Sequence, residues 1–565
     1  MNNYYLQCKT LREYINYSIE YFGNETFLCE VDGDKLTYDE VFTKIKTMIA
    51  TFKSLNIQKG EKIAIIGPNS INWAISFLSI LYYGAVAVPI LPDFSFNSII
   101  NILNLSESKA VFLNKYYLDI FEINQPKFLE YAFSLENLQL IDISDKFSID
   151  KQIFNNINNF LKKADTFIKT TLKKEQEIKP DDLASLVYTS GTTGVSKGVL
   201  LTHKNILSSI KGGLFYVDPE IGKERFLSVL PLAHTYESSL GLLAPMSFGA
   251  SIYYVTQRLG ARVLLQAFQK VKPTMMFAVP LIMEKIYKTK IKKKFESNML
   301  LKALVSFPIT RKILYKKAAD QLHKTLGGEL KHIGFGGAPI HPEVERFMYE
   351  GNFPYHVGYG MTECAPLIAG SKVTDTKLYS CGYATPEAKI RIYNPDPKTG
   401  IGEIQTKGDM VFSGYFNNKE ATEKIFTKDG WLKTGDLAKM DKHGYIYIKG
   451  RLKNIILGSS GENIYPEEIE QLLDSDLFVI ESLVIQRQSK LIALIYPDIE
   501  LIFEKNSFYS KDQSHVKEWI NDYFQKLIDK INVVLPNFSK ISEFKLVEEE
   551  FEKTPTKKIK RFLYQ

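Results

Sequence analysis

Short runs of apolar residues alternate with segments of helical length through roughly the first 450 residues of the chain. The runs read KIAIIG, VAVPIL, AVFL, ASLVYTS, ASIYYV, MMFAVP and LKHIGFGG. Continuous apolar runs of this length are typical of strands buried on both faces, and parallel strands need a connection of helical length between them. The pattern therefore predicts an α/β fold in which helices cover both faces of doubly wound sheets.

One stretch, Ile63–Pro92, has no charged side chain and must be weighed as a membrane span. Glycine, proline and small polar residues interrupt it, which predicts a strand over 62–66, then a helix that is capped by Asn69 or Ser70 and ends at Gly84, then a second strand. A helix of about 13 residues is too short to cross about 30 Å of hydrocarbon. The stretch is better explained as a buried β-α-β unit.

The pattern of apolar and turn residues changes near Tyr383, where short strand-like runs and tight turns begin. This change predicts a small antiparallel or barrel-like subdomain over about 383–450. A compact tail with its own apolar pattern follows. We therefore expect a large N-terminal domain over 1–452 and a small α+β C-terminal domain over 453–565.

Composition excludes several classes of protein. The chain has 565 residues, 45% of them hydrophobic and 24% charged, and its mean hydropathy is −0.13. These values exclude a disordered chain and a protein with many membrane spans. The net charge of +7 is small for this length and does not indicate a nucleic-acid binder. Four scattered cysteines and a charged N-terminus without a signal peptide favour a reducing, cytoplasmic environment.

Positive charge is concentrated in one segment, residues 288–317. Ten basic residues stand there against a single acid, Glu296, and apolar side chains are interleaved with them. Such a segment fits the anionic inner face of a membrane, so we expect peripheral membrane contact. The alternative is a solvated helical insertion without a partner. Nucleic acid is not expected, because the segment contains no binding motif. The basic residues are Lys288, Lys290, Lys292, Lys293, Lys294, Lys302, Arg311, Lys312, Lys316 and Lys317.

The strongest chemical signal is a loop of small and hydroxylic residues after the apolar run 183–187. Glycines let backbone amides approach an anion, hydroxyls donate to phosphate oxygens, and Lys197 adds positive charge. It is not a Walker A loop, because Gly198 follows the lysine where Ser or Thr is required. The alternative is a flexible surface turn. The candidate phosphate-binding residues are Thr189, Ser190, Gly191, Thr192, Thr193, Gly194 and Lys197.

Taken with motifs further along the chain, this loop resembles the phosphate loop of the adenylate-forming superfamily. That superfamily includes acyl-CoA synthetases, adenylation domains of peptide synthetases and luciferases. The resemblance extends over essentially the whole chain. Its further motifs, in chain order, are Pro231-Leu-Ala-His-Thr-Tyr-Glu237, Gly336-Gly-Ala-Pro339, Tyr359-Gly-Met-Thr-Glu363, Thr434-Gly-Asp-Leu437, Gly450-Arg-Leu-Lys453 and Lys558-Ile-Lys-Arg561.

The resemblance implies a nucleotide site that binds ATP and Mg²⁺. It implies that Tyr359 packs against the adenine, that Thr362 contacts phosphate, and that Glu363 coordinates the Mg²⁺. A bland alternative for Glu363 is a solvated acid at the start of a helix. The other residues assigned to this pocket are Gly337, Ala338, Gly360 and Met361.

The resemblance also assigns residues near the end of the chain. Asp436 is expected to bind the ribose hydroxyls, although it could be an ordinary turn aspartate, and Arg451 the ribose–phosphate side. Lys558 is expected to reach the α-phosphate and the attacking carboxylate. Lys557 remains an alternative, because the glycine that usually precedes this lysine is missing. Lys453 takes the position of the hinge about which the C-terminal domain rotates.

The acyl group is expected near His234 and Tyr236. For His234, an ordinary histidine with satisfied hydrogen bonds remains an alternative. Cys364 follows the acidic residue of its motif, but no base lies nearby in the sequence, so it is expected to pack rather than react.

Several details resemble the long-chain fatty acyl-CoA branch. We therefore expect an AMP-forming fatty acid:CoA ligase that makes an acyl-adenylate from ATP and then a thioester with CoA. One alternative is an enzyme that acylates a carrier protein, or adenylates another carboxylic acid. An alternative of another class is an inactive acyl- or nucleotide-binding protein, against which the complete motif set argues.

Overall fold

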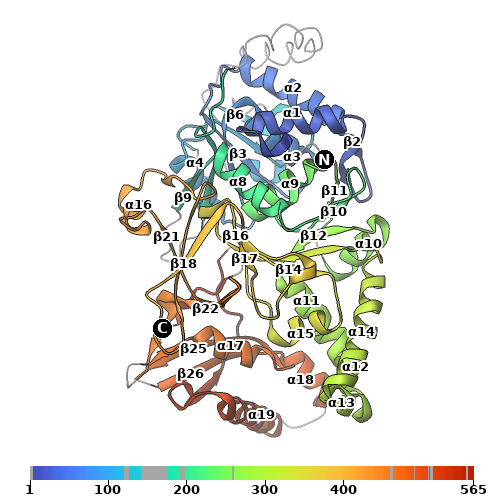
Figure 1. Ribbon diagram of the computed structural model, residues 1–565, viewed down its shortest axis with the longest axis vertical. Coiled ribbons are helices and arrows are strands. Elements are labelled where there is room, and N and C mark those ends of the chain that lie inside the picture. The colour runs from blue at the N-terminus through green and yellow to red at the C-terminus, as the bar shows by residue number, and fades with distance from the viewer. Residues whose placement is uncertain are drawn as a thin grey trace.

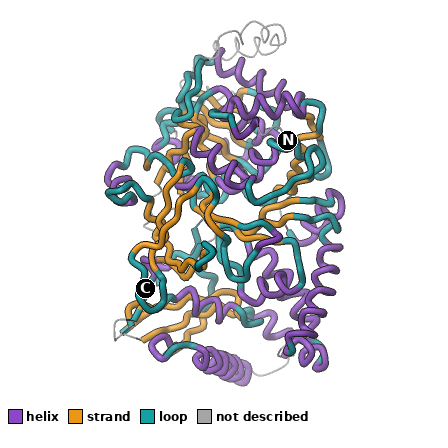
Figure 2. The backbone as a smooth tube through the Cα atoms, viewed as in Figure 1, coloured by secondary structure: helices purple, strands orange, loops and turns teal. Residues whose placement is uncertain are grey.

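The computed structural model describes residues 4–119, 126–141, 176–189, 197–257, 260–458, 462–488, 490–506, 508, 513–554 and 558–564. Two large sheets and their helices form the N-terminal part of the molecule, and the C-terminal part lies at the opposite end of the long axis (Figure 1). Strands are gathered in the interior while helices cover them (Figure 2). This arrangement confirms the predicted α/β fold with covered sheets.

The first large sheet contains the strands predicted from the earliest apolar runs. Neighbouring strands from β8 to β6 are parallel, whereas β8–β9, β9–β20 and β6–β7 are antiparallel pairs. Across the sheet, the order is β20 (Gly414–Tyr415), β9 (Lys197–Thr202), β8 (Leu183–Thr189), β4 (Val86–Ile90), β3 (Lys62–Ile66), β5 (Ala110–Leu113), β6 (Tyr131–Ser134) and β7 (Leu140–Ile141).

The second large sheet is parallel except at its β1–β2 edge. Its order is β14 (Tyr355–Val357), β13 (His332–Phe335), β12 (Met275–Ala278), β10 (Arg225–Ser228), β11 (Ser251–Tyr254), β1 (Thr26–Glu30) and β2 (Lys35–Thr37). The helices packed around the two sheets are α1 (Leu11–Phe22), α2 (Tyr38–Ser54), α3 (Ile71–Tyr83), α4 (Phe96–Leu105), α8 (His203–Leu214), α9 (Ala244–Met246), α10 (Ala261–Val271), α11 (Pro280–Ile286) and α15 (Pro342–Glu350).

The uncharged stretch forms the predicted β-α-β unit. Strands β3 and β4 pair in parallel, and α3 connects them. Ser70 caps the helix by accepting a hydrogen bond from the backbone N–H of Trp73. Gly84 ends it in the left-handed region, with φ of +91°, where a side chain would be strained. Among the described residues, no helix has the length and apolar character needed to span a membrane.

Shorter antiparallel sheets follow, as the change of pattern predicted. A three-stranded sheet consists of β15 (Tyr359–Gly360), β16 (Leu367–Gly370) and β17 (Tyr383–Ala384). A four-stranded sheet consists of β18 (Ala388–Tyr393), β19 (Gly402–Gly408), β21 (Leu432–Met440) and β22 (Ile446–Arg451). A short helix, α16 (Lys419–Ile425), precedes β21.

The C-terminal part has a hydrophobic core of its own, in which helices pack against a three-stranded sheet. The division into domains at 452/453 remains a prediction. The elements of this part are η7 (Leu452–Asn454), β23 (Ile456–Leu457), β24 (Asn463–Ile464), α17 (Pro466–Asp474), β25 (Val479–Arg487), β26 (Lys490–Pro497), α18 (Ile499–Asn506), α19 (Gln513–Val534) and β27 (Glu543–Leu546).

The basic segment is a string of helices between β12 and β13. It begins in a π-helical turn, η4 (Tyr287–Lys292), and continues through α12 (Lys293–Glu296), α13 (Met299–Ser306) and α14 (Pro308–Thr325). In Figure 1 these helices run down one side of the molecule to the end where the C-terminal part lies.

Candidate active site

Two motifs meet at the carboxyl edge of the second large sheet. Gly337 and Ala338 follow β13, and Tyr359 follows the neighbouring strand β14. Because these strands are parallel, both loops leave the same edge, which is where open α/β sheets bind ligands. Gly337 has φ of +83° and, like Ala338, is exposed. Gly360 lies so close to the carbonyl of Pro366 that a Cβ would stand 1.9 Å from its oxygen.

Asp436 links the sheet edge to the small antiparallel sheet. The hydroxyl of Tyr359 donates a 2.8 Å hydrogen bond to one carboxylate oxygen of Asp436. The guanidinium Nε of Arg451, its register partner on β22, lies 3.0 Å from the other. The backbone N–H of Asp436 donates to the hydroxyl of Thr434. Asp436 is therefore held between an aromatic ring and a cation, rather than standing alone in a turn.

Glu363 is buried in the 3₁₀ turn η5 (Thr362–Cys364). The hydroxyl of Tyr415 donates a 2.8 Å hydrogen bond to its Oε1, and the ammonium of Lys197 lies 5.1 Å from the centre of that tyrosine ring. A carboxylate of this kind is a ligand type that Mg²⁺ prefers in proteins. In the described part of the chain no cluster of three or more ligand-type residues exists.

The candidate phosphate-binding segment lies in the sequence between β8 and β9, which pair antiparallel. Thr189 ends β8 and faces Lys197 at the start of β9. The predicted loop residues Ser190, Gly191, Thr192, Thr193 and Gly194 lie outside the described residues.

Lys558 enters the site from the C-terminal part. Its backbone N–H donates to the hydroxyl of Thr554, and its carbonyl accepts from the backbone of the same residue. Desolvation lowers the pKa of Lys558, the charge of Arg451 lowers it further, and the charges of Asp436 and Glu363 oppose the shift. The Lys558 ammonium therefore lies in the electrostatic field of Arg451, Asp436 and Glu363. Lys557 lies outside the described residues.

Lys453, the predicted hinge residue, is also affected by the positive charges of this region. Partial burial, followed by the charges of Arg451 and Lys558, lowers the pKa of Lys453 to about 8. Lys453 lies in η7, directly after β22. The basic groups of this region therefore crowd together, as expected where a polyanionic ligand is to be neutralised.

His234 and Tyr236 lie at the carboxyl end of β10. Burial, followed by the charge of Lys558, lowers the pKa of His234 to about 4, so this imidazole is neutral near pH 7. Its Nδ1 accepts a hydrogen bond from the backbone N–H of Tyr236. The hydroxyl of Tyr236 donates to the carbonyl of Gly334 on β13, which fixes the ring against the second sheet.

A small apolar cavity of about 50 Å³ lies beside the ring of Tyr236. His234 is not among the described residues that line it. The lining consists of Gly213, Leu214, Tyr216, Val217, Phe226, Tyr236, Leu240, Ala244, Pro245, Phe248, Met275, Phe277, His356, Gly358, Leu367 and Gly370.

Sequence reasoning missed most of this cavity and two supporting residues, Tyr415 and Thr434. The cavity residues come from several strands and helices, and each reads locally as ordinary core. Thr434 belongs to a recognised motif, so its hydrogen bond to Asp436 could have been anticipated. Tyr415 gave no signal, because only the packing of β20 against β9 brings it to Glu363.

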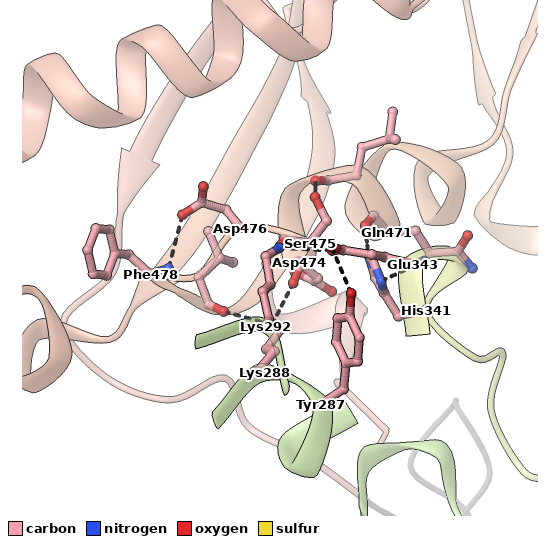
Figure 3. Close-up of polar contacts among 12 residues, drawn as sticks. Tyr287, Lys288, Lys292, His341, Glu343, Gln471, Asp474, Ser475, Asp476 and Phe478 are labelled. Carbon is pink, nitrogen blue, oxygen red and sulfur yellow. Dashed lines mark hydrogen bonds and ion pairs between the residues drawn. The ribbon is translucent and has the colours of Figure 1, made fainter. Parts of the chain in front are cut away.

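The C-terminal part is held against the helices after β12 by polar contacts (Figure 3). Lys288 donates to the carbonyl of Asp474 at 2.6 Å, and Lys292 donates to that of Ser475 at 3.1 Å. His341 Nε2 lies 3.0 Å from the carbonyl oxygen of Gln471. All three acceptors belong to the last turn of α17 or the residue after it.

Comparisons with known proteins agree with this architecture. The sequence model of the AMP-binding enzyme family matches residues 17–416. A long-chain-fatty-acid–CoA ligase of Gallus gallus is 28% identical over 520 residues, covering 86% of this chain and 67% of the relative. Another, from Mycobacterium bovis, is 27% identical over 576 residues, covering 94% and 91%.

Solved structures show the same fold. An o-succinylbenzoate coenzyme A synthetase from Bacillus subtilis, in complex with ATP and a magnesium ion, aligns with a TM-score of 0.70 at 22% identity. The alignment covers 97% of this chain and 98% of that structure.

Proposed function

The chain belongs to the AMP-binding enzyme family, and we propose that it is an AMP-forming fatty acid:CoA ligase. The observation that carries the proposal is the convergence of Tyr359, Glu363, Asp436, Arg451 and Lys558 at one sheet edge, with an apolar cavity beside it. The polar residues would bind the nucleotide, and the adjacent cavity would bind the apolar part of the acid. The similarity to long-chain-fatty-acid–CoA ligases supports the same substrate class.

In the first half-reaction, a carboxylate oxygen of the fatty acid attacks the α-phosphorus of ATP, and the bond to pyrophosphate breaks. Both reactants are anions, so catalysis needs positive charge and positioning. Lys558 and Arg451 supply the charge. Mg²⁺, when held through Glu363, neutralises further charge on the phosphates.

Nucleotide recognition is assigned to residues already held in place. Tyr359 offers its ring to the adenine, with Gly337 and Ala338 as the opposite wall. Asp436 accepts hydrogen bonds from the ribose hydroxyls, and its contacts with Tyr359 and Arg451 orient the carboxylate. We assign the remaining contacts with the nucleotide and its phosphates to Gly360, Met361, Thr362 and the loop 189–197.

The acyl chain is assigned to the cavity beside Tyr236. The cavity is lined mainly by apolar and aromatic side chains from α8, the second sheet and β16. A hydrocarbon chain loses contact with water there without burying an unpaired polar group of its own. His234 is assigned to the entrance rather than to the cavity, since its ring stands near Lys558.

In the second half-reaction, the thiol of CoA loses its proton, the sulfur attacks the acyl carbonyl carbon, and the bond to AMP breaks. We include in the proposal a rotation of the C-terminal part about Lys453, which would withdraw Lys558 and present the loop 458–466 to the thiol.

The decisive experiment is a two-stage assay on the full chain. Pyrophosphate release is measured with fatty acids from butyrate to stearate, and thioester formation is then measured with CoA and with an acyl carrier protein. We expect pyrophosphate release that favours long acids, and thioester with CoA. Thioester with carrier protein alone would favour the other acceptor, and no pyrophosphate with any acid would overturn the enzyme assignment.

A further inference from the structure

An apolar surface is left uncovered at the far end of the basic segment. Helix α13 has no buried residue among its eight, although most of them are apolar. Five apolar side chains of α13 and the start of α14 are each more than half exposed, and we call them the α13–α14 tip. They are Met299 (88%), Leu300 (67%), Phe307 (64%), Ile309 (79%) and Ile313 (54%).

The fold of the segment produces this surface. Helix α14 buries Tyr315, Ala319 and Leu322 along one face. Ile309 and Ile313, four residues apart, therefore share another face that turns away from the core. Helix α14 is apolar on two sides, and only one of them packs against the protein. Contiguous exposed apolar side chains of this kind mark interaction sites.

The lysines of the segment divide into two groups. Four basic residues contact other parts of the protein, and these are Lys288, Lys292, Lys293 and Arg311. A fifth, Lys316, pairs with Asp320 of its own helix. Five others have no acidic partner in the described part of the chain, and these are Lys290, Lys294, Lys302, Lys312 and Lys317. Three members of the second group, Lys302, Lys312 and Lys317, belong to the same two helices as the tip.

We propose that the α13–α14 tip inserts into the headgroup region of an anionic lipid bilayer, with the uncommitted lysines around it contacting lipid phosphates. An apolar surface with basic residues on the same helices is complementary to such a bilayer in both polarity and charge. A second copy of the chain is a poorer partner, because a symmetric contact would bring the two sets of lysines together.

This location corrects part of the expectation drawn from the sequence. Membrane contact was expected along the whole of residues 288–317, with apolar residues interleaved throughout. Ile291, Phe295 and Tyr315 are instead buried in the core, and the lysines at the start of the segment bind the C-terminal part. The apolar side chains of this segment that are more than half exposed lie between Met299 and Ile313.

The usefulness of docking rests on the proposed function, because a long-chain acid partitions into lipid and would be captured there. Docking itself can be tested without catalysis. The full chain is sedimented with phosphatidylcholine vesicles, and with vesicles that also contain phosphatidylglycerol, in the absence of ATP. We expect binding to the anionic vesicles only, weakened by added salt.

Two variants separate the apolar and the ionic contributions. Phe307→Ser with Ile309→Ser should weaken vesicle binding at least tenfold, whereas Tyr116→Ser, which removes another exposed ring, should not. Lys302→Gln with Lys312→Gln should weaken binding and reduce its salt dependence, whereas Lys398→Gln with Lys442→Gln should do neither. Pyrophosphate release with a short, water-soluble acid should remain unchanged in all four and reports on folding.

Three outcomes would overturn the proposal. Equal binding to neutral and anionic vesicles would show that the lysines do not contribute to binding. Normal binding of the Phe307/Ile309 variant would show that the tip is not the docking surface. Loss of a dimer in that variant by sedimentation velocity, without vesicle binding by the parent, would assign the tip to a second copy. A chain that binds vesicles but releases no pyrophosphate would refute the proposed function and leave the docking surface standing.

Discussion

The side-chain ammonium of Lys288 lies 2.6 Å from the backbone carbonyl oxygen of Asp474, where helix α17 ends. The last carbonyls of a helix have no partner within it, and a cation is favourable at that end. Lys292 and His341 contact two more carbonyls of the same turn. Lys288, Lys292 and His341 all come from the N-terminal part of the chain. Together they cap the C-terminal end of helix α17.

This capping predicts an effect on one half-reaction. Lys288→Met with Lys292→Met should slow adenylation about five- to tenfold, because losing about 1 to 1.4 kcal/mol of contact energy loosens the orientation that brings Lys558 to the site. Thioester formation from supplied acyl-adenylate should be unchanged. Lys290→Met, on the same turn but exposed, is the matched control. Equal slowing of both half-reactions would contradict this interpretation.

Lys558 is predicted to act in adenylation alone. Lys558→Ala should reduce pyrophosphate release by about 10²- to 10³-fold, a range typical for loss of one group that stabilises developing charge. Thioester formation from supplied acyl-adenylate should stay within about threefold of normal, because the α-phosphate is no longer under attack. Rapid-quench measurement of each step decides the matter. A larger effect from Lys557→Ala would transfer the role to that residue.

Glu363 is predicted to be the protein's ligand for Mg²⁺. Glu363→Gln keeps the shape of the side chain but removes its charge, so adenylation should slow severely and require more Mg²⁺. Tyr415→Phe removes only the hydrogen bond to Glu363 and should give a smaller shift in the same direction. Titrations of initial rate against Mg²⁺ compare the three proteins. Normal activity of Glu363→Gln at limiting Mg²⁺ would exclude the ligand role.

The cavity is predicted to set the preferred acid. Val217 lines it and is only partly buried, so a larger side chain can be accepted there with little overpacking of the core. Val217→Trp should raise KM for stearate about tenfold or more and leave shorter acids nearly unaffected. Val217→Ala, which enlarges the space, is the control. An unchanged chain-length profile would place the acyl group elsewhere.

Glu237 is predicted to make stability depend on pH. Burial raises its pKa to about 8, against a hydrogen bond with Ser228 that lowers it. Between the ordinary pKa near 4.5 and the folded value, the unfolded chain has lost this proton and the folded chain keeps it, so stability falls as pH rises.

The variant Glu237→Gln lacks that titration, while the other buried carboxyls are common to both proteins. Its stability relative to the parent should therefore increase with pH across this window, by at most about 1.4 kcal/mol per pH unit. Thermal unfolding from about pH 5 to about pH 8 tests this. A constant difference in Tm would mean that Glu237 is ionised in the folded protein.

Sequence alone determined the features that depend on near neighbours. Strand β3, helix α3 with its Ser70 cap, and the stop at Gly84 follow from apolar runs and from capping and turn residues, whose effects extend over a few positions. The motifs were visible for a similar reason, because each places its chemical groups within one short loop.

Tertiary structure alone decided which distant groups meet. Tyr359 and Asp436 are 77 positions apart and bond only because the small sheet folds back over the edge of the large one. The basic segment also shows that composition does not reveal which groups meet in the folded protein. Its composition indicated a single cationic face, but packing committed Lys288 and Lys292 to helix α17 and left Phe307 and Ile309 uncovered. A charge or an apolar side chain acquires its role from the partner that reaches it, and composition cannot say which partner that is.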